Sequence, residues 1–96
     1  MLIAKVVGDV VASQKVSGIV GHKLLLVQPV DVKGAAKGNP LVASDGVGAG
    51  PSEWVIVCQG SPARMTPVSE GRPVDAVVIG IIDSIQFEGE EVYRKS

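Results

Sequence analysis

The stretch that decides the fold is Leu2-Ile3-Ala4-Lys5-Val6-Val7-Gly8-Asp9-Val10-Val11-Ala12-Ser13. Every second residue from position 2 to position 12 is small or apolar, whereas the residues between them mix polar and apolar side chains. Because successive side chains of a strand point to opposite faces, this alternation predicts a β-strand with one core face and one partly wetted face. Gly8 indicates a bend or β-bulge of the kind that a strongly curved sheet needs.

A second stretch, Lys23-Leu24-Leu25-Leu26-Val27-Gln28-Pro29-Val30-Asp31, is apolar on both faces of the strand that it predicts. A strand tolerates this pattern only when both of its sides are covered. Pro29 cannot donate a hydrogen bond to a neighbouring strand, so it marks an edge or a strand end.

The rest of the chain divides into short apolar runs and glycine-rich turns. We expect an exposed turn region at residues 33–40 and a short strand at residues 41–44. A glycine-rich connection at residues 46–51 leads into a strand at residues 53–58. The last strong strand is expected at residues 76–87.

Two smaller elements complete the expected organisation. Residues 60–65 read Gly-Ser-Pro-Ala-Arg-Met, which suits one helical turn with Ser61 as N-cap and Pro62 at the first helical position. Residues 89–96 are expected to form a charged tail.

The composition favours strands throughout. The chain has 18 Val and 7 Ile against 5 Leu, and branching at Cβ suits a pleated surface better than a helix. Five apolar segments linked by turns in 96 residues predict one all-β domain, residues 1–96, folded as a small five-stranded OB-like β-barrel with one short helical turn. A two-layer sandwich is the alternative architecture.

The balance of charge and apolar residues bounds the function. A formal net charge of -1 with no basic block argues against a nucleic-acid partner. The longest apolar run is far too short to span a membrane, and one cysteine without a secretory signal predicts a cytoplasmic protein. A hydrophobic content of 46% exceeds what so small a core is expected to hide, so we expect association with other copies.

Candidates for chemistry are few, and the sequence predicts no catalytic residue, metal or cofactor. His22 is the only histidine, and Cys58 follows Val-Ile-Val in a strand, where a small core residue is the expected role. The glycines of residues 46–50 suggest a phosphate loop, but no Lys-Ser/Thr pair and no helix follow them. The carboxylates Glu53, Glu70, Asp75 and Asp83 form no pair that spacing alone places together; ordinary ion pairing, for instance of Asp75 with Arg64 or Arg72, is expected.

Five motifs follow one another along nearly the whole chain: Ile3-Ala4-Lys5-Val6 with Gly8 and Val10-Val11; Gly21-His22-Lys23-Leu24-Leu25-Leu26-Val27-Gln28-Pro29-Val30-Asp31; Val47-Gly48-Ala49-Gly50 before Glu53-Trp54-Val55; Gly60-Ser61 with Ala63-Arg64; and Arg72-Pro73-Val74-Asp75-Ala76 leading into Ile79-Gly80-Ile81-Ile82-Asp83. Together they resemble the EutN/CcmL family, the vertex proteins of bacterial microcompartments. One departure is Ser52, which stands where the family usually has glycine. If that glycine uses positive φ, Ser52 either is strained or sends the loop along another path.

The resemblance implies a non-enzymatic shell protein whose OB-like barrels form a homopentamer. The pentamer is expected to occupy the five-fold corners of a microcompartment shell, with hexameric shell proteins as partners and no nucleic acid or membrane. It also implies a set of residues at the subunit interface and near the five-fold axis: Val47, Gly48, Ala49, Gly50, Glu53, Trp54, Gly60, Ser61 and Arg64.

Two other functions remain open from the residues alone. One is an OB-type binding module that uses the amides of residues 46–50 to hold an anionic ligand or a single-stranded nucleic acid. The weaker one is a small thiol enzyme built on Cys58.

Overall fold

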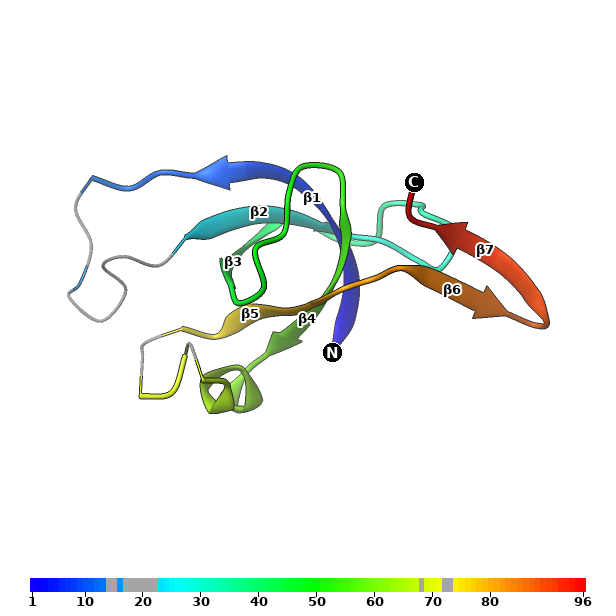
Figure 1. Ribbon diagram of the computed structural model, residues 1–96. Helices are drawn as coiled ribbons and strands as arrows, with labels where there is room; N and C mark the ends of the chain where they lie inside the picture. Colours follow the sequence, from blue (N-terminus) through cyan, green and yellow to red (C-terminus); the bar gives the residue numbers. More distant parts are fainter. Residues whose placement is uncertain (14–15, 17–22, 68, 72–73) are drawn as a thin grey trace.

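Five β-strands close into a barrel, seen in Figure 1 around the centre of the molecule. They are β1 (Leu2–Val10), β2 (Leu24–Pro29), β3 (Leu41–Asp45), β4 (Trp54–Gln59) and β5 (Ala76–Ile81). The computed structural model describes residues 1–13, 16, 23–67, 69–71 and 74–96, so His22 and Arg72 of the sequence predictions lie outside the described residues.

The strand order around the barrel is β1-β2-β3-β5-β4, and every neighbouring pair is antiparallel except β3 and β5. The β3–β5 pair is parallel and short, with Ser44 opposite Val77 and Asp45 opposite Val78. This closed order confirms the predicted all-β, OB-like barrel and makes the two-layer sandwich wrong.

The core includes Ala4 and Val6 of β1, which the sequence pattern placed on the core face, together with residues of the other four barrel strands and of the β3–β4 loop. It contains small and β-branched side chains, since the inside of a five-stranded barrel is narrow. The side chains that form the core cluster are Ala4, Val6, Leu25, Val27, Ala43, Ala49, Val55, Val57, Ala76 and Val78.

The predicted features of β1 and β2 are present. The β1–β2 register shifts between Val6 and Gly8, which confirms the bulge expected at this glycine. β2 ends at Pro29, as expected of a residue without a backbone N–H. Leu24 and Leu26 on the second face of β2 are only half-buried, so the described part of this chain leaves that face incompletely covered.

The prediction for the end of the chain is wrong. The expected strand at residues 76–87 breaks into β5 and β6 (Ser84–Phe87), and the expected charged tail contains β7 (Glu90–Arg94), which pairs with β6. Beyond Ile82, whose amide donates to the Trp54 carbonyl at 2.8 Å, the chain has passed the start of β4 and loses that partner. Glu88 and Gly89 have φ of 52° and 81°, as in the two-residue type I′ turn that joins hairpin strands.

The predicted helical turn exists as a 3-10 turn, η2 (Ser61–Met65), with Pro62 in its first positions, but Ser61 is not its N-cap. Gly60 occupies that position with φ of 73°, and no side chain caps the turn. Instead, the Ser61 hydroxyl accepts a hydrogen bond from Nη2 of Arg64 at 3.4 Å. The turn is held by fully buried Ser69, whose hydroxyl donates to the Ala63 carbonyl.

Ser52 adopts the left-handed conformation, with φ of 67°. Its amide donates to the carbonyl of Val6 at 3.0 Å, which ties the loop before β4 to the β1 bulge. The sequence left two alternatives, a strained Ser52 or a different path of the loop. The structure shows the first, because Ser52 has the positive φ that favours glycine.

The whole molecule measures 45 × 24 × 23 Å. The β6–β7 hairpin, orange and red in Figure 1, projects away from the barrel. The described residues include no helix that is long and apolar enough to cross a membrane.

Replacing Leu25, the largest fully buried side chain of the core, by Ala should lower the free energy of unfolding by about 2–5 kcal/mol, through lost transfer energy and the cavity left behind. Val11→Ala is the control, because Val11 is 93% exposed and should change stability by no more than about 0.5 kcal/mol. Urea unfolding at one fixed protein concentration measures both variants. Equal effects of the two substitutions would contradict the assignment of the core.

Ser52→Gly should raise the free energy of unfolding by up to about 1.5 kcal/mol. Removing the left-handed strain is worth about 1–2 kcal/mol, and the greater freedom of glycine in the unfolded chain costs about 0.5–1 kcal/mol of that gain. Ser84→Gly, the same change in an ordinary strand, should instead lower stability by about 0.5–1 kcal/mol. A loss of stability in Ser52→Gly would show that Ser52 is not strained.

Candidate functional site: the loop between β3 and β4

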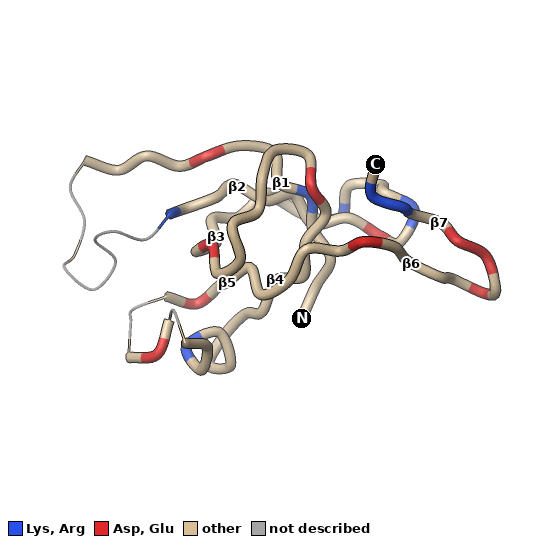
Figure 2. Tube along the Cα trace, in the orientation of Figure 1, with Lys and Arg blue, Asp and Glu red and all other residues tan. Residues whose placement is uncertain are grey.

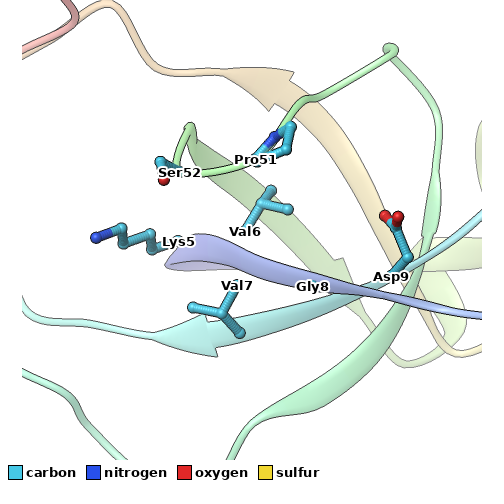
Figure 3. A pocket seen from close by; sticks show the side chains of 7 residues that line it. All are labelled: Lys5, Val6, Val7, Gly8, Asp9, Pro51 and Ser52. Atoms are coloured by element: carbon cyan, nitrogen blue, oxygen red, sulfur yellow. The ribbon is translucent and has the colours of Figure 1, made fainter.

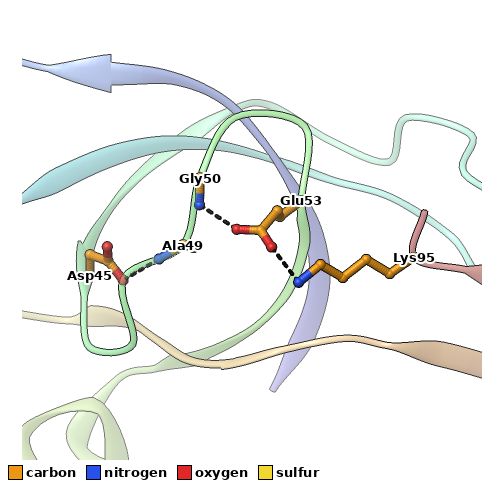
Figure 4. Close-up of polar contacts among 5 residues, drawn as sticks. All are labelled: Asp45, Ala49, Gly50, Glu53 and Lys95. Carbon is orange, nitrogen blue, oxygen red and sulfur yellow. Dashed lines mark hydrogen bonds and ion pairs between the residues drawn. The ribbon is translucent and has the colours of Figure 1, made fainter.

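The loop between β3 and β4 is organised around one carboxylate. Asp45, the last residue of β3, accepts hydrogen bonds on Oδ1 from the amides of Val47, Gly48 and Ala49 at 3.0, 2.9 and 3.3 Å. Figure 4 shows this oxygen turned back into the loop. The amide of Gly46 donates to the Val78 carbonyl of β5 at 3.0 Å. The loop is thus shaped by groups from β3 and β5, the two strands that close the barrel.

A second carboxylate fixes the other end of the loop. Glu53 accepts the Gly50 amide on Oε1 at 2.5 Å, and its Oε2 pairs with Nζ of Lys95 at 2.8 Å (Figure 4). The backbone carbonyl of Glu53 also accepts the Val6 amide at 2.9 Å. Glu53 therefore joins the loop, β1 and the end of the chain.

All five amides of residues 46–50 are donated within the chain, four of them to carboxylates and one to a backbone carbonyl. An anion-binding nest needs free amides and a positive potential. Here the nest already contains the carboxylate of Asp45, which both consumes the donors and repels a second anion. This arrangement argues against the anion-binding alternative.

The ion pair between Glu53 and Lys95 shifts the pKa of both residues. The hydrogen bond from Lys95, followed by that from the Gly50 amide, lowers the pKa of Glu53 below its ordinary value of 4.5. The same contact with Glu53 raises the pKa of Lys95 above 10.5. Both groups lie near the surface, so solvent screens the pair and its contribution to stability is small.

Trp54 is held by its own chain on two sides. Its ring stacks on Tyr93 of β7, with centroids 4.1 Å apart and an interplanar angle of 16°. Gly34 lies so close that a Cβ on it would come within 3.2 Å of Trp54 Cζ2, and Gly34 has φ of 95°. Trp54, predicted at a subunit interface, therefore also anchors the β6–β7 hairpin and the β2–β3 loop to the barrel.

The predicted interface residues fall into two groups. Val47, Gly48, Ala49, Gly50, Glu53 and Trp54 belong to the loop and the start of β4, whereas Gly60, Ser61 and Arg64 lie beyond its far end, in and next to η2. Val47 and Gly48 are exposed, as are the three residues at η2, but Ala49 is 1% exposed and belongs to the core.

An apolar hollow of about 350 Å³ lies between the β3–β4 loop and the segment that follows η2. It is lined by Gly46 and Val47 from the loop, Thr66 and Pro67 after η2, and Val77, Val78 and Ile79 of β5. Of the predicted interface residues, only Val47 lines this hollow; Gly60, Ser61 and Arg64 do not.

Sequence reasoning missed Asp45, Tyr93 and Lys95. Asp45 had a usable signal, because an Asp that precedes a glycine-rich turn commonly accepts amides from the following residues. No local sequence signal marks Tyr93 or Lys95, since the residues that they contact, Trp54 and Glu53, lie about forty positions earlier in the chain.

The residues considered for chemistry are not arranged for it. Cys58 is a 7% exposed core residue of β4, as predicted. No group of three His, Cys, Asp or Glu that could hold a metal occurs in the described part of the chain.

A hollow of about 290 Å³ beside the loop has Lys5 and Asp9 at its rim, with Val6 beneath Pro51 and Ser52 (Figure 3). Arg94–Glu91 and Lys95–Glu53 are the ion pairs found among the described residues, so the suggested Asp75–Arg64 pair is not formed.

Glu53→Gln should lower stability only in a defined pH window. The lowered pKa of Glu53 stabilises the fold above 4.5, and this contribution is lost as the pH falls through the lowered value. The raised pKa of Lys95 stabilises the fold below 10.5, and this contribution is lost as the pH rises through the raised value. The parent and Glu53→Gln should therefore differ most between these values; the difference should disappear at low pH and shrink at high pH, where the bond from the Gly50 amide to the Glu53 carboxylate remains. Thermal unfolding as a function of pH measures this, with exposed Glu70→Gln as the control; a constant difference at all pH values would contradict the ion pair.

Comparison with known proteins agrees with this geometry. The family described as ethanolamine utilisation protein EutN/carboxysome matches residues 1–83. The carboxysome shell vertex protein CcmL of Gloeobacter violaceus is 50% identical over 95 residues, which cover 99% of this chain and 95% of that protein.

Solved structures agree as well. The structure of CcmL from Nostoc sp. PCC 7120 superposes with a TM-score of 0.94 at 49% identity, over 99% of this chain and 100% of that chain. GrpN, a pentameric microcompartment shell protein from Rhodospirillum rubrum, superposes with a TM-score of 0.83 at 39% identity, over 91% of this chain and 99% of that chain. The chain therefore belongs to the EutN/CcmL family.

Proposed function

We propose that this protein is a structural shell component whose homopentamers cap the five-fold vertices of a bacterial microcompartment. The observation that carries the proposal is the likeness, over nearly the full length, to a carboxysome shell vertex protein and to a pentameric shell protein. Residues 1–96 act as one domain in this proposal, because Glu53 and Trp54 tie the terminal hairpin to the barrel.

The outer surface of the barrel supports association with further copies. Val7, Val42 and Val47 are 50%, 46% and 41% exposed, and Leu26, which pairs with Val42 across β2 and β3, is only half-buried. Each apolar side chain that an interface covers is worth about 1.5–3 kcal/mol when fully buried. A ring of identical subunits covers such surfaces through head-to-tail contacts between two different faces.

The proposed mechanism is geometric. A flat layer of hexameric shell proteins cannot close on itself, and a pentamer inserted at each corner supplies the missing curvature and seals the gap. The role needs no catalytic residue and no cofactor, and the partners are copies of this chain and hexameric shell proteins rather than nucleic acid or membrane. A net charge of -1 and the filled amide nest of the β3–β4 loop are consistent with such a building block.

The nine predicted interface residues keep this role in the proposal, in different ways. Val47 and Gly48 offer exposed surface to the neighbouring subunit, and Ala49, Gly50, Glu53 and Trp54 hold that surface in shape. Gly60, Ser61 and Arg64 are exposed at η2 and are proposed to lie toward the five-fold axis.

Native mass spectrometry of the purified protein should detect a complex of five chains. Val47→Asp should shift it toward monomers, because it places a charge in the proposed interface without disturbing the core or requiring an unusual φ. Val11→Asp, the same change at a 93% exposed residue beyond the end of β1, should leave the complex intact. Gly48 is a poorer probe, since its φ of 78° makes any larger residue strain the loop itself.

Far-ultraviolet circular dichroism should show that the Val47→Asp monomer keeps its β-structure. A parent protein that is monomeric at micromolar concentration would overturn the proposed function. Normal pentamers of Val47→Asp would instead show that the β3–β4 loop is not in the interface.

A further inference from the structure

The β3–β4 loop begins at a pair of residues that is chemically labile in a polypeptide, Asp45-Gly46. When glycine follows an aspartate, its amide nitrogen can reach the carboxyl carbon of that aspartate with little hindrance, because glycine has no Cβ. Figure 2 shows acidic residues spread over the barrel and the hairpin, but only one aspartate of the sequence, Asp45, is followed by glycine. The other aspartates are Asp9, Asp31, Asp75 and Asp83.

The reaction of such a pair is isomerisation of the backbone. The Gly46 nitrogen bonds to Cγ of Asp45, and its proton leaves with one carboxyl oxygen as water. The cyclic succinimide then takes up a water molecule at one of its carbonyl carbons. Addition at Cγ restores aspartate, whereas addition at the former main-chain carbon gives isoaspartate, in which the chain runs through the side chain. No electrons are transferred, and the mass of the chain is unchanged.

The closed barrel keeps the two reacting groups apart. The Gly46 amide donates to the Val78 carbonyl of β5 at 3.0 Å, so its hydrogen is already engaged. The Asp45 carboxylate accepts the three amides of residues 47–49 on Oδ1, which turns it into the loop beyond Gly46 (Figure 4). Asp45 also lies opposite Val78 in the β3–β5 ladder, which fixes the backbone on which the ring would form. Both groups are therefore released only when this pairing opens.

The pairing that protects the site is the shortest in the barrel. Among the described residues it consists of two pairs, Ser44–Val77 and Asp45–Val78, whereas every other neighbouring pair of barrel strands has at least four. Val77 and Val78 are fully buried, so packing in the core holds this short pairing closed. Parts of a fold with few backbone bonds open more often than the rest of the molecule. Barrel closure is thus where protection of Asp45 is first lost.

We propose that Asp45-Gly46 is a latent site of backbone isomerisation, which the β3–β5 pairing keeps unreactive in the closed barrel. A chain that has isomerised there cannot rebuild the β3–β4 loop. Isoaspartate adds one carbon to the main chain and removes the carboxylate from the side chain. Oδ1 then no longer holds the loop amides, and Gly46 loses its register with Val78. This inference goes beyond the proposed function, because it concerns the single chain and does not need the pentamer.

Peptide mapping measures the reaction at this site alone. Tryptic cleavage after Lys37 and Arg64 gives a peptide whose only aspartate is Asp45. Its one asparagine, Asn39, precedes Pro40, which has no amide hydrogen and cannot close the same ring. The full chain is incubated at one pH and temperature in buffer and in guanidinium chloride, and electron-transfer fragmentation detects isoaspartate. Isoaspartate should form at least about tenfold faster in the denaturant, because only the open fraction reacts in buffer.

Asp31 is the matched control within the same chain. Its Oδ1 also accepts backbone amides, those of Lys33 and Ala35, but the next residue is Val32, whose branched Cβ hinders the attack. In the denaturant, the tryptic peptide of residues 24–33 should contain far less isoaspartate than the Asp45 peptide. Equal formation at the two sites would overturn the assignment of the labile pair, and equal rates at Asp45 in buffer and denaturant would overturn its protection.

Matched core truncations test whether the β3–β5 pairing is what protects. Val78 of this pairing and Val27 of β2 are both fully buried valines. Val78→Ala should speed isomerisation of the folded protein by about tenfold, because it loosens the pairing as well as the core. Val27→Ala should speed it less, and equal acceleration by the two variants would overturn the role of the pairing. Circular dichroism checks that both stay folded, and Val77→Ala replaces Val78→Ala if that variant does not fold.

Assembly provides a further readout, which rests on the proposed pentamer. Protein aged in guanidinium chloride is refolded and separated by size exclusion, and each fraction is mapped. Isoaspartate at position 45 should be concentrated in the unassembled fraction. Equal amounts in the assembled and unassembled fractions would overturn the inference that an isomerised loop cannot be rebuilt. A parent protein that never forms pentamers would remove the proposed function but leave the rate comparisons unaffected, so the two failures are distinguishable.

Discussion

The structure depends on a parallel pairing of two residues of β3 with two of β5, which closes the barrel. Asp45, at the end of that pairing, turns its carboxylate back to hold three amides of the β3–β4 loop, and the Gly46 amide donates to the partner strand at Val78. The shape of the loop that we assign to the interface is therefore a consequence of closure. Without it, the open edges of β3 and β5 would be available for pairing with other chains.

Closure also explains why so apolar a chain has so small a core. The inward side chains are mostly Ala and Val, because five strands enclose little space. Other apolar side chains of the described residues lie on the outer face of the barrel and on the hairpin, and Leu26, Val42 and Phe87 among them stay partly exposed. This exposed apolar surface is unfavourable in an isolated subunit, but it stabilises an assembly in which identical subunits cover it.

The sequence predicted the barrel strands well where the pattern was local. Alternation identified β1, Gly8 marked its bulge and Pro29 marked the end of β2. It failed at the end of the chain, where residues 76–87 form two strands that belong to different sheets. Nothing in the apolar pattern of these residues reveals that the first part, β5, pairs with β4, whereas the second part, β6, pairs with β7. The N-cap prediction at Ser61 failed because the turn begins at Ser61 itself, and Gly60, with a positive φ, occupies the cap position.

By itself, the sequence determined the fold class, the core face of β1, the buried role of Cys58 and the surplus of apolar surface, since each of these follows from residue type and spacing along the chain. Its motifs also indicated the family. Only the tertiary structure decided that the amides of the β3–β4 loop are donated within the chain, that Trp54 stacks on Tyr93, that Glu53 pairs with Lys95 and that β6 and β7 form a separate two-stranded sheet. These contacts join residues far apart in sequence, and their geometry is set by the closure of the barrel rather than by any local preference.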